Sequence, residues 1–240
     1  MKNIKSSHLV LITLAVLVVA GILMYHTRST RPLVQESEPD TQATSSVPTP
    51  TDKVVTEKTG VYDISITYPF YSIPSIDTEI QSVITASEKD FKDFASDPAS
   101  VSPAAEQNTL SISYGTKVGN SITTVVFTGS EYTGGAHPIP FYYTVHFDGS
   151  GKIITLDKLF KVPGPTYFAK FSQIVTPQLK QQFGDAFFPD GATSNPENWN
   201  LWYIENGNLV FMFSPYQVAP YAAGTPEVKI PLTDLSDILE

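Results

Sequence analysis

The strongest pattern along the chain is an uncharged apolar run close to its start. Residues 9–24 contain no charged side chain, and they follow Lys2 and Lys5. The run is close to the shortest length that spans a bilayer, and Tyr25 extends it into the interface, where aromatic residues anchor. We predict a transmembrane signal anchor at residues 9–25 and a cytoplasmic tail at residues 1–8. A cleavable signal peptide is the alternative, although no small-x-small cleavage site follows.

Polar residues dominate the next stretch, residues 26–59. Serine, threonine and acidic residues are frequent here, and they are interrupted by Pro32, Pro39, Pro48 and Pro50. Such a composition cannot bury enough apolar surface to offset the entropy lost on ordering. We therefore predict a disordered linker that holds a folded domain away from the outer side of the cytoplasmic membrane.

From residue 61 the pattern becomes that of a folded domain. Residues 61–68 alternate with a period of two, which predicts a half-buried strand that Pro69 ends. Apolar residues then recur at helical spacing, with charged residues between them. The predicted core face of this helix consists of Ile80, Val83, Ile84, Phe91 and Phe94. The charged residues between them are interpreted as a solvated face rather than a metal site.

The rest of the chain predicts hairpins and a second helix. Three pairs of alternating runs flank short turns that contain glycine, the strongest local signal of a hairpin. The pairs are residues 110–117 with 122–128, residues 141–147 with 152–156, and residues 199–204 with 209–213. A helix is predicted at residues 166–183, with a kink or break at Pro177.

This order of elements predicts an α+β fold, a mainly antiparallel sheet with two helices packed on it. The predicted domain covers residues 60–240, with an N-terminal subregion at 60–105 and a C-terminal subregion at 106–240. The formal net charge of −9 argues against a nucleic-acid partner, because no basic surface is present to neutralise phosphates. The absence of cysteine removes thiol nucleophiles, disulfides and thiolate metal sites.

Three motifs in a fixed order resemble a known module. YTGGAH at residues 132–137 precedes an aromatic strand and GKIITLDKLF at residues 151–160. FSPYQVAPYAAG at residues 213–224 then precedes VKIP at residues 228–231. Over residues 61–239 the chain resembles the extracytoplasmic domain of unknown function shared by the anti-sigma factor RsiV and the peptidoglycan deacetylase PdaC.

The resemblance implies the outer module without the activities joined to it in those two proteins. Residues 1–8 are too short for the sigma-binding domain of RsiV, and the Thr-Phe-Asp-Asp signature of the deacetylase is missing. The corresponding region of RsiV binds host lysozyme. The resemblance therefore implies a role in binding a protein or a glycan.

Catalytic and metal-binding motifs are weak. There is no Gly-x-Ser-x-Gly elbow, and a partial P-loop match fails because Ile153 stands where Ser or Thr is needed. A metal site can be drawn from His137, His146 and Asp148, but an exposed strand histidine beside a turn aspartate is the simpler interpretation. We expect no metal, no cofactor and no catalytic residue.

The loop at residues 132–137 is the best candidate site. Its glycines permit close backbone approach, and Pro138 restricts the histidine before it. Tyrosines from two motifs could form an aromatic rim for sugar or protein contact. The predicted ligand-binding residues are Tyr132, Gly134, Gly135, His137, Tyr216 and Tyr221. The alternative is that the loop only redirects the chain and that the tyrosines pack in ordinary loops.

Three functions remain open at this point. The first is a membrane-tethered, non-enzymatic binding or sensing module for a lysozyme-like protein or for peptidoglycan. The second is a cell-envelope hydrolase that uses His137 with a carboxylate. The third is an interaction module that recruits other envelope proteins. An open cleft lined by tyrosines around His137 favours binding, whereas a buried, fully hydrogen-bonded ring favours a structural role.

Overall fold

The computed structural model describes residues 48–97, 107–134 and 136–240 of the 240-residue chain. The predicted tail, the predicted anchor and most of the predicted linker lie outside these ranges. Within the described ranges, no helix has both the length and the apolar character that crossing a bilayer requires. The membrane anchor therefore stays a prediction.

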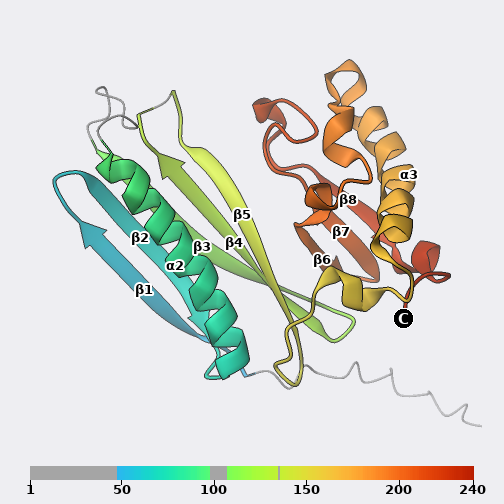
Figure 1. Ribbon diagram of the computed structural model, residues 1–240, viewed down its shortest axis with the longest axis horizontal. Coiled ribbons are helices and arrows are strands. Elements are labelled where there is room, and N and C mark those ends of the chain that lie inside the picture. The colour runs from blue at the N-terminus through green and yellow to red at the C-terminus, as the bar shows by residue number, and fades with distance from the viewer. Residues whose placement is uncertain (1–47, 98–106, 135) are drawn as a thin grey trace, which may run out of the picture. The chain divides into compact units, whose positions relative to one another are not determined.

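A five-stranded sheet forms the first half of the described chain (Figure 1). Its strands lie in sequence order, and only the pair β2 and β3 is parallel. They are β1 (Thr51–Lys58), β2 (Tyr62–Phe70), β3 (Asn108–Gly119), β4 (Ile122–Tyr132) and β5 (Ile139–Asp148). The strand predicted at residues 61–68 is confirmed as β2, which continues through Pro69 to Phe70.

Strand β1 corrects the predicted linker. Residues 51–58 were assigned to the disordered segment, but they pair with β2 from Thr51 opposite Phe70 to Lys58 opposite Asp63. The segment is polar on average, yet it contains the β-branched residues that a pleated edge accepts. The last part of the predicted linker therefore belongs to the sheet.

Helix α2 (Pro74–Ser96) lies along one face of this sheet (Figure 1). It begins with proline in its first turn, and the Asp77 carboxylate accepts a hydrogen bond from the Tyr71 N–H at 2.8 Å. The buried face consists of Ile76, Ile80, Ile84, Ser87, Phe91 and Ala95. The prediction is wrong for Phe94, which is 39% exposed, because Ala95 takes the inward position in the last turn.

The second half contains helix α3 (Gly164–Phe183) and a three-stranded antiparallel sheet (Figure 1). Its strands are β6 (Trp202–Glu205), β7 (Asn208–Met212) and β8 (Glu227–Pro231). Short 3₁₀ helices fill the connections: η1 (Leu156–Leu159), η2 (Gly184–Ala186), η3 (Pro189–Ala192), η4 (Pro196–Trp199), η5 (Tyr221–Ala223) and η6 (Leu232–Leu235). Helix α3 continues through Pro177, so the predicted break does not occur.

The α+β class is confirmed, but the strands form two sheets rather than one. Each sheet has its own apolar core, with α2 on the first and α3 on the second. The cores divide the chain near residue 155 rather than at the predicted boundary after residue 105, because β3, β4 and β5 continue the sheet that β1 and β2 begin. We call residues 51–154 the first lobe and residues 155–240 the second lobe.

Two of the three predicted hairpins form as expected. Asn120 and Ser121 connect β3 to β4 with φ of 48° and 60°, and Asn206 and Gly207 connect β6 to β7 with φ of 50° and 72°. Two consecutive residues with positive φ define the type I′ turn, whose twist matches that of the strands. The sequence located both hairpins, but the first turn consists of Asn120 and Ser121, because Gly119 pairs with Ile122 as the last residue of β3.

In the remaining hairpin, predicted from residues 141–147 and 152–156, the second run does not form a strand. After the turn at Asp148, a single bridge joins Phe147 to Ile153, and the chain then enters η1. The side chains of Leu156 and Leu159 pack against the core of the second lobe. Burial of these residues in the other core outweighs continued pairing with β5.

The lobes meet at β6, which contacts the β3–β4 hairpin and β5, and at a cluster in which Val126 and Tyr142 pack against Tyr203, Val210 and Met212. A Cβ atom on Gly119 would lie 2.4 Å from the Ile204 carbonyl oxygen, so only glycine permits this approach. Lys117 pairs with Glu205 at 2.9 Å, and its Nζ lies 5.0 Å from the centre of the Tyr203 ring.

Candidate functional site

Three of the predicted site residues come together in one stack of rings. The centres of the His137 and Tyr221 rings are 4.1 Å apart with 27° between the ring planes. The Tyr221 and Tyr216 ring centres are 5.6 Å apart at 35°. We call His137, Tyr221 and Tyr216 the aromatic ladder. Tyr216 is 61% exposed and His137 is also exposed, so the ladder faces solvent.

The ladder joins loops from both lobes through one carbonyl group. The Pro138 carbonyl oxygen lies 2.9 Å from His137 Nδ1 and accepts a hydrogen bond from the ring. The Tyr221 hydroxyl donates to the same oxygen at 3.4 Å. This arrangement fixes the orientation of both rings.

The loop after β7 is held by its own buried residues. Val218 is fully buried and Ala219 is 2% exposed, so the chain between the two tyrosines is anchored in the second core. The Gln217 amide donates to the Gly191 carbonyl at 3.0 Å and to the Asn198 carbonyl at 3.1 Å. These contacts leave the tyrosine rings on the outside of an ordered loop.

Tyr216 occupies a costly backbone conformation. Gln217 N–H donates to the Ser214 carbonyl at 3.0 Å, and Pro215 and Tyr216 lie between them. Tyr216 has φ of 69°, as the third position of a type II turn requires, and glycine or asparagine normally occupies that position. An ordinary side chain in this region costs about 1–2 kcal/mol. Such strain at an exposed aromatic residue is typical of a binding site.

The rest of the predicted loop site is less connected to the ladder. Tyr132 ends β4 opposite Thr109 and is not one of the stacked rings. Gly134 has φ of 95°, which a residue with a Cβ atom rarely adopts. Gly135 lies outside the described residues. Further along, Ile139 at the start of β5 is 65% exposed.

His146 is a buried structural residue. It is 6% exposed, its ring is stacked on Trp202 with centres 3.7 Å apart, and its nitrogens lie 3.0 Å and 3.1 Å from the hydroxyls of Thr124 and Thr144. Burial lowers the pKa of His146 to about 3, so the ring is neutral at physiological pH. The interpretation of His146 as an exposed strand histidine was wrong.

Asp148 is committed to its own turn. Its carboxylate accepts hydrogen bonds from the Ser150 hydroxyl and from the N–H groups of Ser150 and Lys152, and these bonds lower its pKa. The structure therefore does not assemble the metal site drawn from His137, His146 and Asp148. In the part of the chain that is described, no group of three or more His, Asp or Glu side chains is arranged to hold a metal ion.

The environment of His137 also bears on the hydrolase alternative. The ring contacts the Pro138 carbonyl oxygen and the Tyr221 ring, and neither is a carboxylate. Among the described residues, these contacts do not supply the His-carboxylate pair that general-base catalysis would use.

Two neighbouring cavities lie beside β5, and the Thr144 hydroxyl donates to the Asn200 carbonyl at 3.4 Å where they adjoin. Their volumes are about 300 Å³ and 360 Å³, and both are lined by Thr144 and Asn200. Glu79 and Val83 of α2 line one side, and residues from η4 to the start of β6 line the other. We call this feature the edge groove. The sequence did not predict it, because its lining comes from segments that share no motif.

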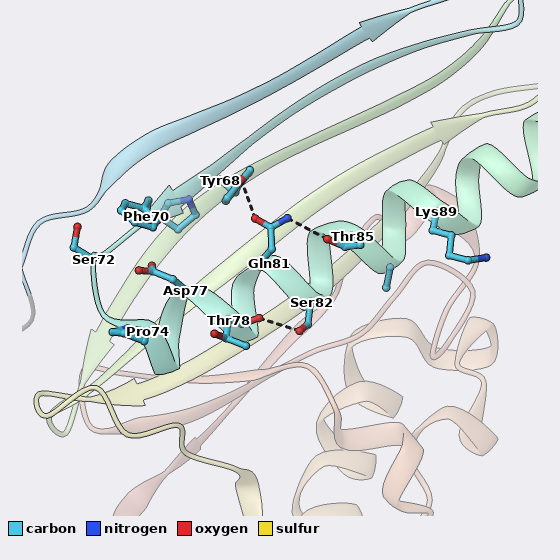
Figure 2. A pocket seen from close by; sticks show the side chains of 12 residues that line it. Tyr68, Phe70, Ser72, Pro74, Asp77, Thr78, Gln81, Ser82, Thr85 and Lys89 are labelled. Carbon is cyan, nitrogen blue, oxygen red and sulfur yellow. Dashed lines mark hydrogen bonds between the residues drawn. The ribbon is translucent and has the colours of Figure 1, made fainter.

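A larger groove, of about 950 Å³, lies between α2 and the end of β2 (Figure 2). Figure 2 shows Tyr68 and Phe70 on the strand side, facing the helix side chains. The Tyr68 hydroxyl donates to Gln81 at 3.0 Å, and the Gln81 amide donates to Thr85 at 3.1 Å. Two further polar lining residues already have partners, because Asp77 accepts from the Tyr71 N–H and Lys89 pairs with Asp93, and nothing in the described residues shows what covers the groove.

Comparisons with known proteins find a family match within the second lobe and solved structures with a similar fold. Residues 157–233 match a family described as a protein of unknown function, DUF3298. This range contains Tyr216 and Tyr221 but not His137. Over 184 residues the chain is 27% identical to the immunogenic protein MPT64 of Mycobacterium tuberculosis and to MPB64 of Mycobacterium bovis, which covers 74% of this chain and 78% of each relative.

Solved structures of DUF3298 proteins share the fold. A crystal structure from Pseudomonas aeruginosa PAO1 has a TM-score of 0.58 at 17% identity, and covers 81% of this chain and 94% of that chain. A family member from Bacteroides fragilis NCTC 9343 has the same TM-score and identity, with 80% and 93% covered. The similarity therefore includes the first lobe as well as the matched segment. The resemblance to the RsiV and PdaC domain stays a prediction.

Proposed function

We propose that this protein is a non-enzymatic binding module for a cell-wall-associated ligand, either peptidoglycan or a lysozyme-like protein. In this proposal the N-terminal segment anchors the module on the outer side of the cytoplasmic membrane. The aromatic ladder is the observation that carries the proposal. The predicted anchor and the resemblance to the RsiV and PdaC domain supply the location and the ligand class.

The ladder has the properties of a preformed contact surface. Aromatic rings give a large contact area and lose little conformational entropy when their orientation is already fixed. Here the Pro138 carbonyl and the buried Val218 fix that orientation before any ligand is present. Flat rings beside hydroxyl groups suit a sugar face or the apolar core of a protein interface.

Charge favours one kind of protein ligand. The formal net charge of −9 steers basic partners toward the module and repels acidic ones. A basic muramidase fits this condition better than an acidic protein, and an uncharged glycan is not affected by it.

Binding to purified wall sacculi and to lysozyme tests the proposal directly. The full-length chain should bind at least one of the two, and Tyr221→Ala should reduce that binding at least tenfold. Phe94→Ala is the matched control, because Phe94 is also a partly exposed aromatic residue but lies on α2 and is not one of the stacked rings. Failure of the unchanged protein to bind either ligand would refute the proposal.

The location has its own test. Protease added to intact cells should cleave the described domain from the membrane fraction. If the chain is protected in intact cells and cleaved only after lysis, the predicted topology is inverted.

A further inference from the structure

The outer edge of β5 carries backbone groups that point away from the sheet. The Ile154 N–H donates to the His146 carbonyl oxygen at 2.8 Å, so the backbone groups of His146 face away from β4. Because the direction of these groups alternates along a strand, those of Thr144 and Tyr142 face the same way. Within the described residues, β5 pairs with β4 along its length and with Ile153 at a single bridge.

Among the described residues, no strand pairs with Thr144 on this side of β5, because the hairpin predicted from residues 141–147 and 152–156 stops early, and the Thr144 hydroxyl reaches the second lobe at the Asn200 carbonyl. Had the register between Phe147 and Ile153 continued, Leu156 would have paired with Thr144. Instead Leu156 begins η1 and packs against the second core. The edge groove lies at this place and follows β5 from Tyr142 to His146.

The groove walls suit an added strand. Side chains of an added strand would point alternately to its two sides. One side is formed by Glu79 and Val83 of α2, and the other by Asn200 and Met212 of the second lobe. Asn198 and Gln217 also line the groove, but their amide groups already bond to backbone carbonyls of the second lobe.

The charge of the residues that line the groove determines which side chains an added strand should carry. Glu79 and Glu197 line the groove, as does Asp157, whose carboxylate pairs with Lys158 at 3.1 Å. Among the described lining residues there is no lysine or arginine. A strand with basic side chains is therefore complementary, and an acidic strand is repelled.

We infer that the edge groove binds an extended, basic segment of a partner protein, which adds to β5 as a further strand. Strand addition takes its affinity from main-chain hydrogen bonds and its specificity from alternate side chains. This inference goes beyond the proposed function, because it uses neither the aromatic ladder nor a wall ligand. Pro140 lies in the same outward series and has no N–H, which sets the end of the usable edge.

Short capped peptides test the inference with the full-length chain. The probe is acetyl-Thr-Lys-Val-Lys-Thr-amide, and its matched control carries Glu at both Lys positions. Trp199 and Trp202, which are the chain's two tryptophans, line the groove, so tryptophan fluorescence reports occupancy. The basic peptide should change this fluorescence and slow hydrogen exchange in residues 141–148. The acidic peptide should bind at least tenfold more weakly.

Two substitutions at Thr144 separate the contribution of its backbone N–H to peptide binding from that of its side chain. Thr144→Pro and Thr144→Val both remove the hydroxyl group, but only the proline variant removes the outward N–H. Proline at an outward edge position is compatible with the sheet, as Pro140 shows. Thr144→Pro should bind the basic peptide about tenfold more weakly than Thr144→Val, because the lost N–H leaves a carbonyl of the peptide unpaired.

Modified peptides give the same information without a protein variant. Two forms of the probe are N-methylated at the odd or at the even residues, and only the form whose blocked amides face β5 should lose binding. Equal binding of both forms, or protection at residues 214–224 in place of 141–148, would overturn the inference. Tyr221→Ala should leave peptide binding unchanged, so this result stands apart from any failure of the ladder to bind wall ligands.

Discussion

Replacing Tyr216 with asparagine should stabilise the domain while weakening its binding. The residue occupies the third position of a type II turn with φ of 69°, where asparagine is well tolerated. Relief of the left-handed conformation gains about 1–2 kcal/mol. The ring is 61% exposed, so little apolar burial is lost with it.

The opposing term is the ring contact with Tyr221, whose centre lies 5.6 Å away. An aromatic pair contributes about 0.5–1.5 kcal/mol, and the lower end applies at an exposed site. The difference predicts a net stabilisation of about 0.5–1.5 kcal/mol. For a domain of this size, that corresponds to a rise in Tm of roughly 1–6 °C.

Thermal unfolding and sacculus or lysozyme binding should be measured on the same protein samples. Tyr216→Phe is the control, because it keeps both the ring and the strained backbone, and it should leave Tm and binding close to those of the unchanged protein. A lower Tm for Tyr216→Asn would show that ring packing outweighs the strain. Full retention of binding would show that Tyr216 is not part of the contact surface.

Three further predictions concern the scaffold. Between pH 7 and 5 the contribution of His146 should lower the free energy of unfolding by about 2 kcal/mol. The reason is that the ring takes up a proton near pH 6.5 in the unfolded chain but only near pH 3 in the folded one. Urea titrations should show a smaller pH dependence for His146→Gln. Gly119→Ala should destabilise by about 2 kcal/mol or more, because its Cβ would meet a β6 carbonyl oxygen at 2.4 Å, whereas Gly115→Ala has no neighbour within 4 Å and should change stability far less. Gly191→Ala should lower both Tm and ligand binding, since its Cβ would lie 1.9 Å from the Gln217 carbonyl oxygen that belongs to the ladder loop.

Local signals in the sequence predicted local structure well. The helices α2 and α3 follow from spacing, and the β6–β7 turn follows from the Asn206-Gly207 pair. The β3–β4 turn consists of Asn120 and Ser121, next to the glycine that signalled it. The prediction of a strand at residues 152–156 was wrong for a tertiary reason. Leu156 packs against a core that forms only when segments distant in the sequence meet. Strand β1 was not predicted, because the average composition of the polar segment conceals a short run of β-branched residues.

The sequence identified residues of the candidate site but not the contacts between them. The sequence identified His137 in one motif and the tyrosines in another, but Tyr221 and Pro138 are 83 residues apart and their contact has no local signal. The positive φ of Tyr216 could be anticipated in part, since Pro215 favours the second position of a turn. The groove beside β5 required knowledge of where a predicted strand ends, which periodicity alone does not give.

The rings of the aromatic ladder come from different lobes, and this has a consequence for how the molecule melts. The lobes already share buried packing, because Val126 and Tyr142 pack against Tyr203, Val210 and Met212, and the His146 ring is stacked on Trp202. A compound that spans His137 and Tyr216 would be released when either core unfolds, so each core gains from the other remaining intact. Saturation should therefore raise the unfolding temperature of both lobes.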